Sequence, residues 1–250
     1  MTDLNLTYTL ERQAELIANY NSILSQIQTT IQTNQISRPI QLLPVSKLKP
    51  ASDIQALYDF GLREFGENYT QELIGKAGVL PKDIIWHFIG GLQSSKPKDL
   101  NSGSIENLIV ETIDSLKKVK KLDENRNSAE DKKTGVYVQI NTSEEDQKYG
   151  LALDNLEEIE SIITFILKES KNLELHGLMT IGSFLNSHAE GEENEDFTKL
   201  VNLKKQLDAK FGVDLKLSMG MSSDFKQAIK QGSSEIRVGT DIFGSRPPRA

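Results

Sequence analysis

Short apolar runs alternate with amphipathic segments along most of the chain. The apolar runs predict eight strands, at residues 40–46, 63–66, 84–89, 108–112, 136–140, 173–179, 215–219 and 235–239. The segments between them predict helices at 50–60, 69–76, 96–100, 114–125, 153–168, 195–211 and 224–231. One more helix is predicted over 10–33, where apolar residues recur at helical spacing before Arg38 and Pro39.

This alternation predicts an α/β fold with a parallel sheet. Eight units within 250 residues favour closure into a (β/α)8 TIM barrel. The alternative is an open doubly wound sheet, which usually has fewer strands and a Gly-x-Gly-x-x-Gly motif that is absent after the first strand. We expect a single domain over 1–250, with an N-terminal helical extension at 1–38 and the barrel at 39–250. The polar stretches 123–133 and 186–196 are expected to be exposed loops.

Composition excludes several kinds of site. The chain has no cysteine, so disulfides, thiolate nucleophiles and cysteine metal sites are excluded. Its three histidines lie far apart without metal-ligand spacing, and no metal site is predicted. A net charge of −7 without a basic cluster argues against nucleic acid and anionic membranes as partners.

Hydropathy favours a protein of the cytoplasm. No apolar run approaches the roughly 18 residues that a membrane span needs. The first 20 residues carry Asp3, Glu11 and Glu15 and lack the apolar region of a signal peptide. We therefore expect a soluble cytoplasmic protein, with a mitochondrial location left open.

The first strand ends in a candidate nucleophile, Lys47. In barrels of this kind the site lies at the carboxyl ends of the strands. An amine buried there is kept neutral and can attack a carbonyl carbon to form a Schiff base. The alternative is a lysine that simply extends into solvent.

The last two strands are followed by candidate phosphate-binding loops, Ser218–Asp224 and Arg237–Thr240. Backbone N–H groups at the start of a helix bind phosphate, and barrels often place a phosphate at these loops. The alternative is that Ser222, Ser223 or Asp224 only caps the following helix. If a phosphate binds, the Asp224 carboxylate must point away from it.

Two further residues follow from position. Asn68, after the second strand, can donate and accept hydrogen bonds to a polar ligand or can cap a helix. His87 lies in an apolar strand and is expected to be a buried, hydrogen-bonded histidine.

An amine for a Schiff base and a phosphate loop at one barrel mouth predict an aldehyde that carries a phosphate. Pyridoxal 5′-phosphate (PLP) is that molecule.

Six sequence blocks resemble the pyridoxal phosphate homeostasis protein family (the YggS/PROSC type), and several are most similar to its fungal members. The blocks are Val45–Lys47, Phe65–Glu72, His87–Gln93, His176–Ile181, Leu217–Asp224 and Arg237–Gly244. The resemblance implies the barrel of the alanine racemase N-terminal domain, which is fold type III among PLP proteins. Two residues depart from the family pattern. Gly91 is expected to loosen the loop after the third strand, and Pro44 removes one N–H from the first strand.

The resemblance also implies residue roles. The lysine that matches Lys47 carries the PLP aldimine, the arginine that matches Arg237 faces the pyridine nitrogen, and the asparagine that matches Asn68 lines the ring. The phosphate is held by the residues that match Met221, Ser222, Gly239 and Thr240. Ser218, at the end of the seventh strand, completes the predicted cofactor-binding set.

A guanidinium at the pyridine nitrogen disfavours strong PLP catalysis. Arginine keeps its proton at neutral pH, so it leaves the nitrogen unprotonated and the electron sink weak. Racemisation tolerates a weak sink but needs a second base on the opposite face of the substrate. Alanine racemases take that base from a further domain of a partner chain, and only residues 240–250 follow Gly239 here. We therefore expect an open pocket.

The expected function is that of a monomeric PLP carrier or regulator in vitamin B6 and amino-acid homeostasis, which serves PLP-dependent apo-enzymes. One alternative is a PLP-dependent amino-acid racemase of low activity. Another is a Schiff-base barrel that acts on a sugar phosphate.

Overall fold

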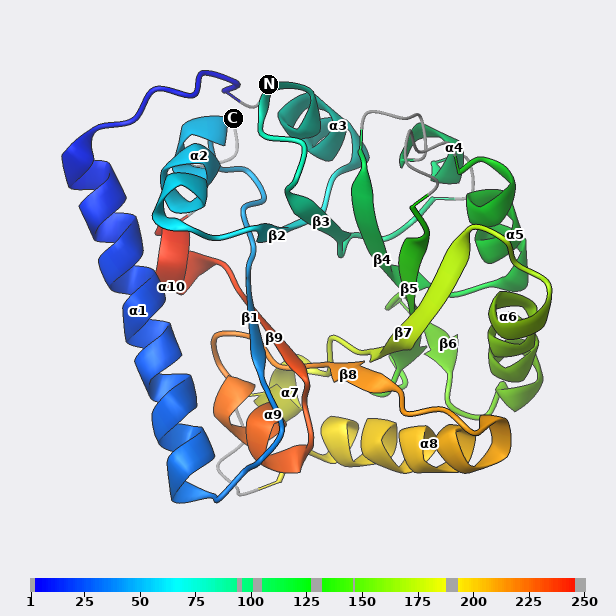
Figure 1. Ribbon diagram of the computed structural model, residues 1–250. Coiled ribbons are helices and arrows are strands. Elements are labelled where there is room, and N and C mark those ends of the chain that lie inside the picture. The colour runs from blue at the N-terminus through cyan, green and yellow to red at the C-terminus, as the bar shows by residue number, and fades with distance from the viewer. Residues whose placement is uncertain are drawn as a thin grey trace.

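Eight parallel strands form a ring that encloses the barrel interior (Figure 1). The computed structural model describes residues 3–93, 96–100, 105–126, 132–145, 147–187 and 193–245. Around the ring the strands follow the order β1-β9-β8-β7-β5-β4-β3-β2, and a short strand, β6, pairs with β5 outside this path. The strands are β1 (Gln41–Pro44), β2 (Glu64–Glu67), β3 (Ile85–Phe88), β4 (Asn107–Ile113), β5 (Thr134–Asn141), β6 (Leu151–Ala152), β7 (Leu173–Met179), β8 (Lys216–Ser218) and β9 (Glu235–Val238). The predicted α/β barrel is confirmed.

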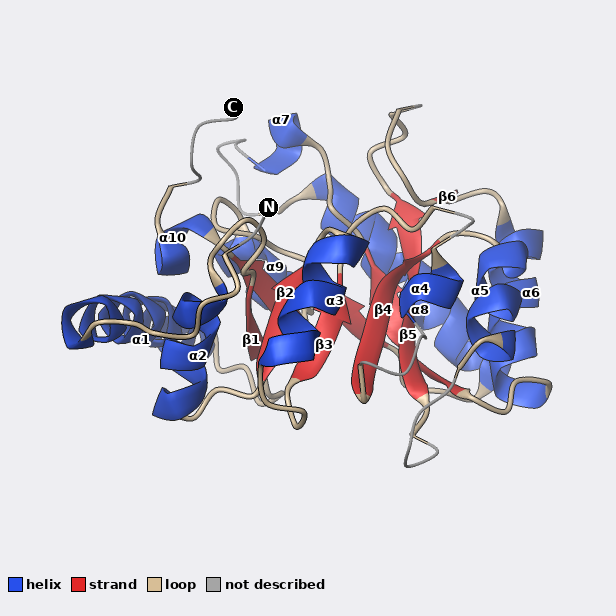
Figure 2. Cartoon of the chain, turned by 90° about the horizontal axis from the view of Figure 1, so that it is seen from above, coloured by secondary structure: helices blue, strands red, loops and turns tan. Residues whose placement is uncertain are grey.

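Helices cover the outside of the ring, except the short α7, which stands beyond one end of it (Figures 1 and 2). They are α1 (Leu10–Thr33), α2 (Ala51–Phe60), α3 (Thr70–Val79), α4 (Pro97–Leu100), α5 (Leu116–Glu124), α6 (Leu156–Lys168), α7 (Phe184–Ser187), α8 (Glu195–Phe211), α9 (Phe225–Gln231) and α10 (Thr240–Phe243). Side chains alternate along each strand, so Ile236 and Val238 of β9 join the large apolar core with the helices, whereas Arg237 does not. A separate small apolar cluster contains Leu43 and Val45 of β1.

The ring closes between β1 and β2 through one bridge, from Val45 to Gly66. Ser46 N–H donates to Gly66 O at 2.9 Å, while Val45 N–H donates to Val238 O on β9 at 2.8 Å. Successive residues of a strand turn their N–H groups toward opposite neighbours. Position 44 therefore faces β2, where Pro44 has no N–H to donate. The proline removes the backbone donor at position 44, whereas a side-chain hydrogen bond from Gln41 to Glu64 also joins the two strands.

The N-terminal helix α1 lies along one side of the barrel, against α2, α9 and α10 (Figure 1). Arg12 binds the Asp53 carboxylate of α2 and donates to Phe243 O of α10 at 2.9 Å. Asn19 donates to Ile242 O at 3.0 Å. The extension thus anchors the short helix that begins at Thr240. Among the described residues, no helix is long and apolar enough to cross a membrane.

The prediction of an exposed loop at 186–196 was wrong at its carboxyl end. Residues 188–192 lie outside the described residues, as do 127–131 of the other predicted loop. Asn194 and Asp196 are buried. The Asn194 side chain caps α8 by accepting from Phe197 N–H, and Asp196 accepts from Ser183 N–H at 2.7 Å. Acidic and amide side chains at a helix start bury readily because backbone N–H groups satisfy them.

Candidate functional site

A cavity of about 280 Å³ opens at the carboxyl ends of the strands. Parallel strands bring their final residues to the same face, so positions from distant parts of the chain meet here. The cavity is lined by Val45, Lys47, Asn68, Ile89, Met179, Ile181, Met221, Ser222, Ser223, Arg237, Gly239 and Thr240. The structure therefore brings together the predicted site residues except Ser218.

The cavity has a buried floor and an exposed rim. Arg237 is 4% exposed and forms the floor. Lys47 is half-buried, and Ser222 and Thr240 are exposed at the rim. A ligand with a charged tail would therefore keep the tail near solvent while its other end reached the guanidinium.

Hydrogen bonds fix the guanidinium of Arg237 at the floor. Its Nη2 donates to Thr180 O at 2.7 Å, and its Nη1 donates to Ser218 Oγ at 2.6 Å. Ser218 is fully buried and does not line the cavity. It was predicted to bind the cofactor, but the structure places it one layer deeper, as a support for Arg237.

The loop between β8 and α9 depends on a glycine and an aspartate. Gly220 has φ +101°, and a Cβ there would lie 2.5 Å from Ala228 Cβ, so another side chain would be strained and crowded. The Asp224 carboxylate accepts from Met221 N–H at 2.7 Å and from Ser187 Oγ at 2.5 Å. Its charge is thus directed away from the cavity, as a bound anion requires, and it makes no side-chain cap on α9.

The wall of the cavity contains a buried side-chain oxygen that makes no hydrogen bond to the described residues. Asn68 Oδ1 is buried and has no hydrogen-bond partner among the described residues. Buried polar atoms are almost always satisfied, so an unpaired acceptor in a cavity wall indicates a ligand. An amine, a guanidinium and two loops with glycine and hydroxyl groups surround the same space. These groups fit PLP.

A buried ion cluster anchors the backbone on both sides of Lys47. Lys76 Nζ, which has no exposed surface, binds Glu67 Oε1 at 2.6 Å, Glu72 Oε1 at 2.7 Å and Ser46 O at 2.8 Å. Leu48 N–H donates to the same Glu72 oxygen at 2.7 Å. Burial raises the pKa of Glu67 to about 7, although the charge of Lys76 opposes this shift.

Sequence reasoning missed this cluster. Its signal was the pair Glu72 and Lys76, four residues apart in a predicted helix, which reads equally well as an exposed ion pair.

A second buried cluster lies beneath Arg237. His87 is 1% exposed, and its Nδ1 lies 2.7 Å from Glu111 Oε1 while its Nε2 lies 3.1 Å from Glu64 Oε2. The prediction of a buried, hydrogen-bonded histidine is confirmed. Burial by itself would lower the pKa of His87, but Glu235, Glu111 and Glu64 raise it to about 10.

The carboxylates of this second cluster were also missed. Glu235 precedes Arg237 by two residues and so shares its face of β9. His87, Glu111 and Glu235 bring ligand atoms within 4.8 Å of one another. However, the 2.7 Å between His87 Nδ1 and Glu111 Oε1 is a hydrogen-bond distance, which a shared proton explains without a metal ion.

Gly91 was expected to loosen the loop after β3, but the ring of Tyr149 packs against this glycine. A Cβ at Gly91 would lie 2.8 Å from the ring of Tyr149. The aromatic ring thus occupies the space that a larger side chain at position 91 would need.

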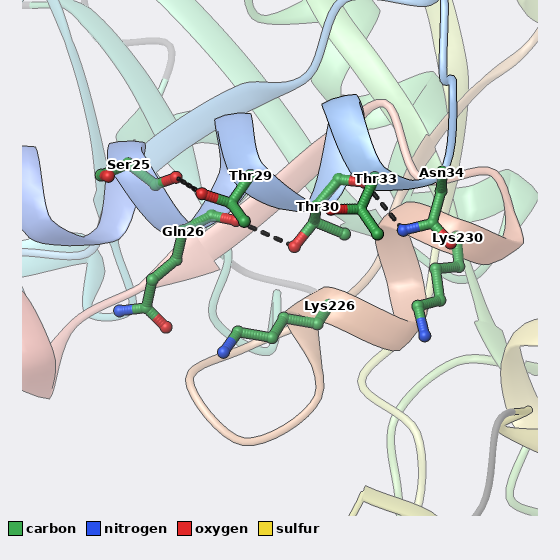
Figure 3. A pocket seen from close by; sticks show the side chains of 8 residues that line it. All are labelled: Ser25, Gln26, Thr29, Thr30, Thr33, Asn34, Lys226 and Lys230. Carbon is green, nitrogen blue, oxygen red and sulfur yellow. Dashed lines mark hydrogen bonds between the residues drawn. The ribbon is translucent and has the colours of Figure 1, made fainter.

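A second hollow, of about 360 Å³, lies between α1 and α9 on the outer surface (Figure 3). The hydroxyls of Thr29 and Thr30 donate to carbonyl groups one turn earlier in α1. Lys226 and Lys230 approach from α9. Because these hydroxyls are satisfied by their own helix, the hollow offers few groups that converge on a ligand. The barrel mouth is the better candidate.

Comparisons with known sequences point to the same site. The family model described as "Alanine racemase, N-terminal domain" matches residues 24–247. The pyridoxal phosphate homeostasis protein of Schizosaccharomyces pombe is 42% identical over 232 residues, which cover 92% of this chain and 94% of that protein. The human pyridoxal phosphate homeostasis protein is 41% identical over 216 residues, which cover 82% of this chain and 76% of that protein.

Solved structures agree with the sequence relatives. PipY of Synechococcus elongatus, solved with PLP bound, has a TM-score of 0.67 and 29% identity and covers 87% of this chain and 100% of its own. An alanine racemase of Clostridium difficile has a TM-score of 0.68 at 16% identity, over 96% of this chain and 61% of its own, and so shares the fold. With its matching family model and its extensive identity to these relatives, the chain belongs to the pyridoxal phosphate homeostasis protein family.

Proposed function

We propose that this chain binds PLP at the mouth of its barrel and acts in PLP homeostasis as a carrier or regulator. The observation that carries the proposal is the single cavity that joins Lys47 to Arg237 and to the two loops after β8 and β9. Relatives that are 42% identical over most of the chain bear the name of this function.

The cavity suggests a role for each residue. Lys47 is the amine for the cofactor aldehyde, and Asn68 meets the ring edge. Arg237 faces the ring nitrogen. The loops Met221–Ser222 and Gly239–Thr240 hold the phosphate at the rim, where Gly239 lets the backbone approach closely. When bound, PLP supplies an electron sink conjugated to its aldehyde carbon.

A carrier fits this cavity better than a racemase does. The Arg237 guanidinium keeps its proton at neutral pH, so it offers the ring nitrogen little help as an electron sink. The alanine racemases that share the fold are only 15–18% identical to this chain. A half-buried Lys47 and exposed Ser222 and Thr240 leave the cofactor accessible. We propose that a cytoplasmic monomer exchanges PLP with apo-enzymes at this rim.

Lys47→Ala is expected to abolish the near-ultraviolet and visible absorbance of lysine-bound PLP. The matched control is Lys226→Ala, which removes an exposed lysine of the outer hollow and should keep the wild-type spectrum. Reduction of the wild-type complex with borohydride, followed by peptide mapping, should label Lys47. A band that survives in Lys47→Ala, or a label on another lysine, would refute the assignment.

The racemase alternative has its own test. The loaded protein is incubated with L- and D-alanine in deuterated water, and exchange of the α-proton is followed by NMR. We expect no exchange above the rate with free PLP. Exchange that is fast and lost in Lys47→Ala would favour the racemase.

A further inference from the structure

The hydrogen bonds around Ser218 require a shared proton. Ser218 Oγ lies 2.6 Å from Arg237 Nη1, 2.6 Å from Glu111 Oε2 and 2.9 Å from Glu235 Oε1. All four side chains are buried. Arginine only donates, and a hydroxyl has one proton to give. If both carboxyl groups were ionised, the two would compete for that proton, and one of their two short contacts with Ser218 Oγ would contain no proton.

The shared proton belongs on Glu235. Glu111 receives a hydrogen bond from His87 Nδ1 as well as one from Ser218, so its charge is well satisfied. Glu235 Oε2 has no hydrogen-bond partner among the described residues, and His87 Nδ1 lies 3.5 Å from it. A neutral carboxyl group tolerates this position far better than a carboxylate does. Burial and the charge of Glu111 raise the pKa of Glu235 to about 8.

Other charged and titratable groups pack around Glu235. The charged and titratable groups around Glu235 are Glu64 on β2, His87 on β3, Glu111 on β4, Tyr137 on β5, His176 on β7, Lys216 on β8 and Arg237 on β9. Burial raises the pKa of Tyr137 and lowers that of His176, so both are neutral near pH 7.

We propose that Glu235 is a positioning residue: it carries a proton at neutral pH, donates it to Ser218 Oγ and so holds Arg237 at the floor of the cavity. Loss of this proton at alkaline pH puts a second carboxylate beside Ser218. The added negative charge draws the guanidinium into the barrel, away from the ligand. The effect on PLP rests on the proposed function, whereas the proton itself does not.

Infrared spectroscopy of the ligand-free protein tests for the proton. Wild type minus Glu235→Gln at pH 7 should show the C=O stretch of a protonated carboxyl group, and in wild type that component should disappear as pH rises through about 8. The control Glu174→Gln changes an exposed glutamate and should leave the component unchanged. Glu67, whose pKa burial raises to about 7, contributes to both proteins and cancels in the difference, so a difference spectrum without this component would overturn the proposal. If Glu235→Gln folds poorly, Glu67→Gln removes the other carboxyl group whose pKa burial raises, and the component that titrates through about 8 should persist in that variant.

Binding of PLP tests the positioning role. Wild-type affinity should fall by up to about tenfold for each pH unit above the transition, whereas Glu235→Gln, which keeps a neutral side chain, should lack this component. Titrations of Lys47 and of PLP itself are common to both proteins and cancel in the comparison. Equal pH profiles would overturn the positioning role. If neither protein bound PLP while the infrared component persisted, the proposed function would fail and the proton assignment would stand.

The pH dependence of folding stability gives a further check, because the buried proton fixes the direction in which stability changes with pH. A carboxyl group whose pKa is higher in the folded state than in the unfolded state makes folding less favourable as pH rises between the two values. For Glu235 this window runs from about 4.5 to about 8. The urea midpoint of Glu235→Gln should therefore rise relative to wild type across the window and level off above it. A difference that does not change with pH would contradict the buried proton.

Discussion

Lys76→Met is expected to lower the free energy of unfolding by about 3–5 kcal/mol at pH 8, the usual cost of removing one partner from a buried ion pair. Lys76 is fully buried, and its ammonium group is the counterion of Glu67 and Glu72. The variant leaves these two carboxyl groups in the interior without their cation. It also removes the Lys76 hydrogen bond to Ser46 O, so the backbone before Lys47 loses that anchor.

The loss should depend on pH. The Lys76 charge holds down the pKa of Glu67, which burial nevertheless raises to about 7. Without the lysine this pKa rises further, and Glu67 binds a proton in the folded variant. The folded variant then holds more protons than its unfolded chain above about pH 4.5, so its stability falls as pH rises. We expect a smaller loss at pH 6 than at pH 8.

Urea denaturation followed by circular dichroism at both pH values measures this effect. Lys210→Met is the control, because Lys210 is 52% exposed and pairs with Glu160 at the surface. Its removal should cost less than about 1 kcal/mol. Equal losses in the two variants would mean that the buried cluster is not an anchor.

Gly90→Ala is expected to destabilise the protein by about 3 kcal/mol, the upper end for overpacking, and to weaken PLP binding. A Cβ at Gly90 would lie 1.8 Å from Asn68 O, which is a backbone atom and cannot rotate away. The neighbouring Ile89 N–H donates to Glu67 O at 2.8 Å, so the two strand ends are tied together here. Relief of the clash must move Asn68, and with it the unpaired Oδ1 in the cavity wall.

The matched control is Gly78→Ala, near the end of α3. A Cβ at Gly78 meets no heavy atom within 4 Å, so alanine should stabilise the helix by up to about 1 kcal/mol. Thermal unfolding compares stability, and absorbance titration compares PLP affinity. A Gly90→Ala variant that matched wild type in both measurements would show that the loop after β3 adapts freely.

The ring of strands and the outline of the site could be predicted from sequence. Apolar runs mark buried parallel strands, and the ends of such strands share one face, so Lys47, Asn68 and Arg237 could be assigned to one cavity. The segments β6, α7 and α10 were not predicted, because two to four residues show little periodicity; the equally short α4 was expected only because it follows a predicted strand. β1 ends at Pro44, two residues earlier than predicted, because the chain enters a turn at Lys47 and only Val45 keeps a bridge, to Gly66.

The buried charges could not be predicted in this way. Lys76 looks like a surface residue because lysine is almost never fully buried without a partner, and its partners come from two elements. Glu111 and Ser218 are 107 positions apart and meet only because β4 and β8 face the same interior. The role of Ser218 as a support for Arg237 depends on that meeting. Contacts across a closed ring have no counterpart in local sequence patterns.

The proline in β1 has a consequence for how the protein would respond to a bound ligand. Because Pro44 lacks an N–H, β1 and β2 share a single backbone bridge within the described residues, close to Lys47. A seam between two strands with so few backbone hydrogen bonds opens locally more often than a fully paired one. A ligand bound both by Lys47, which follows β1, and by Asn68, which follows β2, would hold the two strands together. Resistance to heat and proteases should then track cofactor supply, so a sample's melting temperature would report how much of it is loaded.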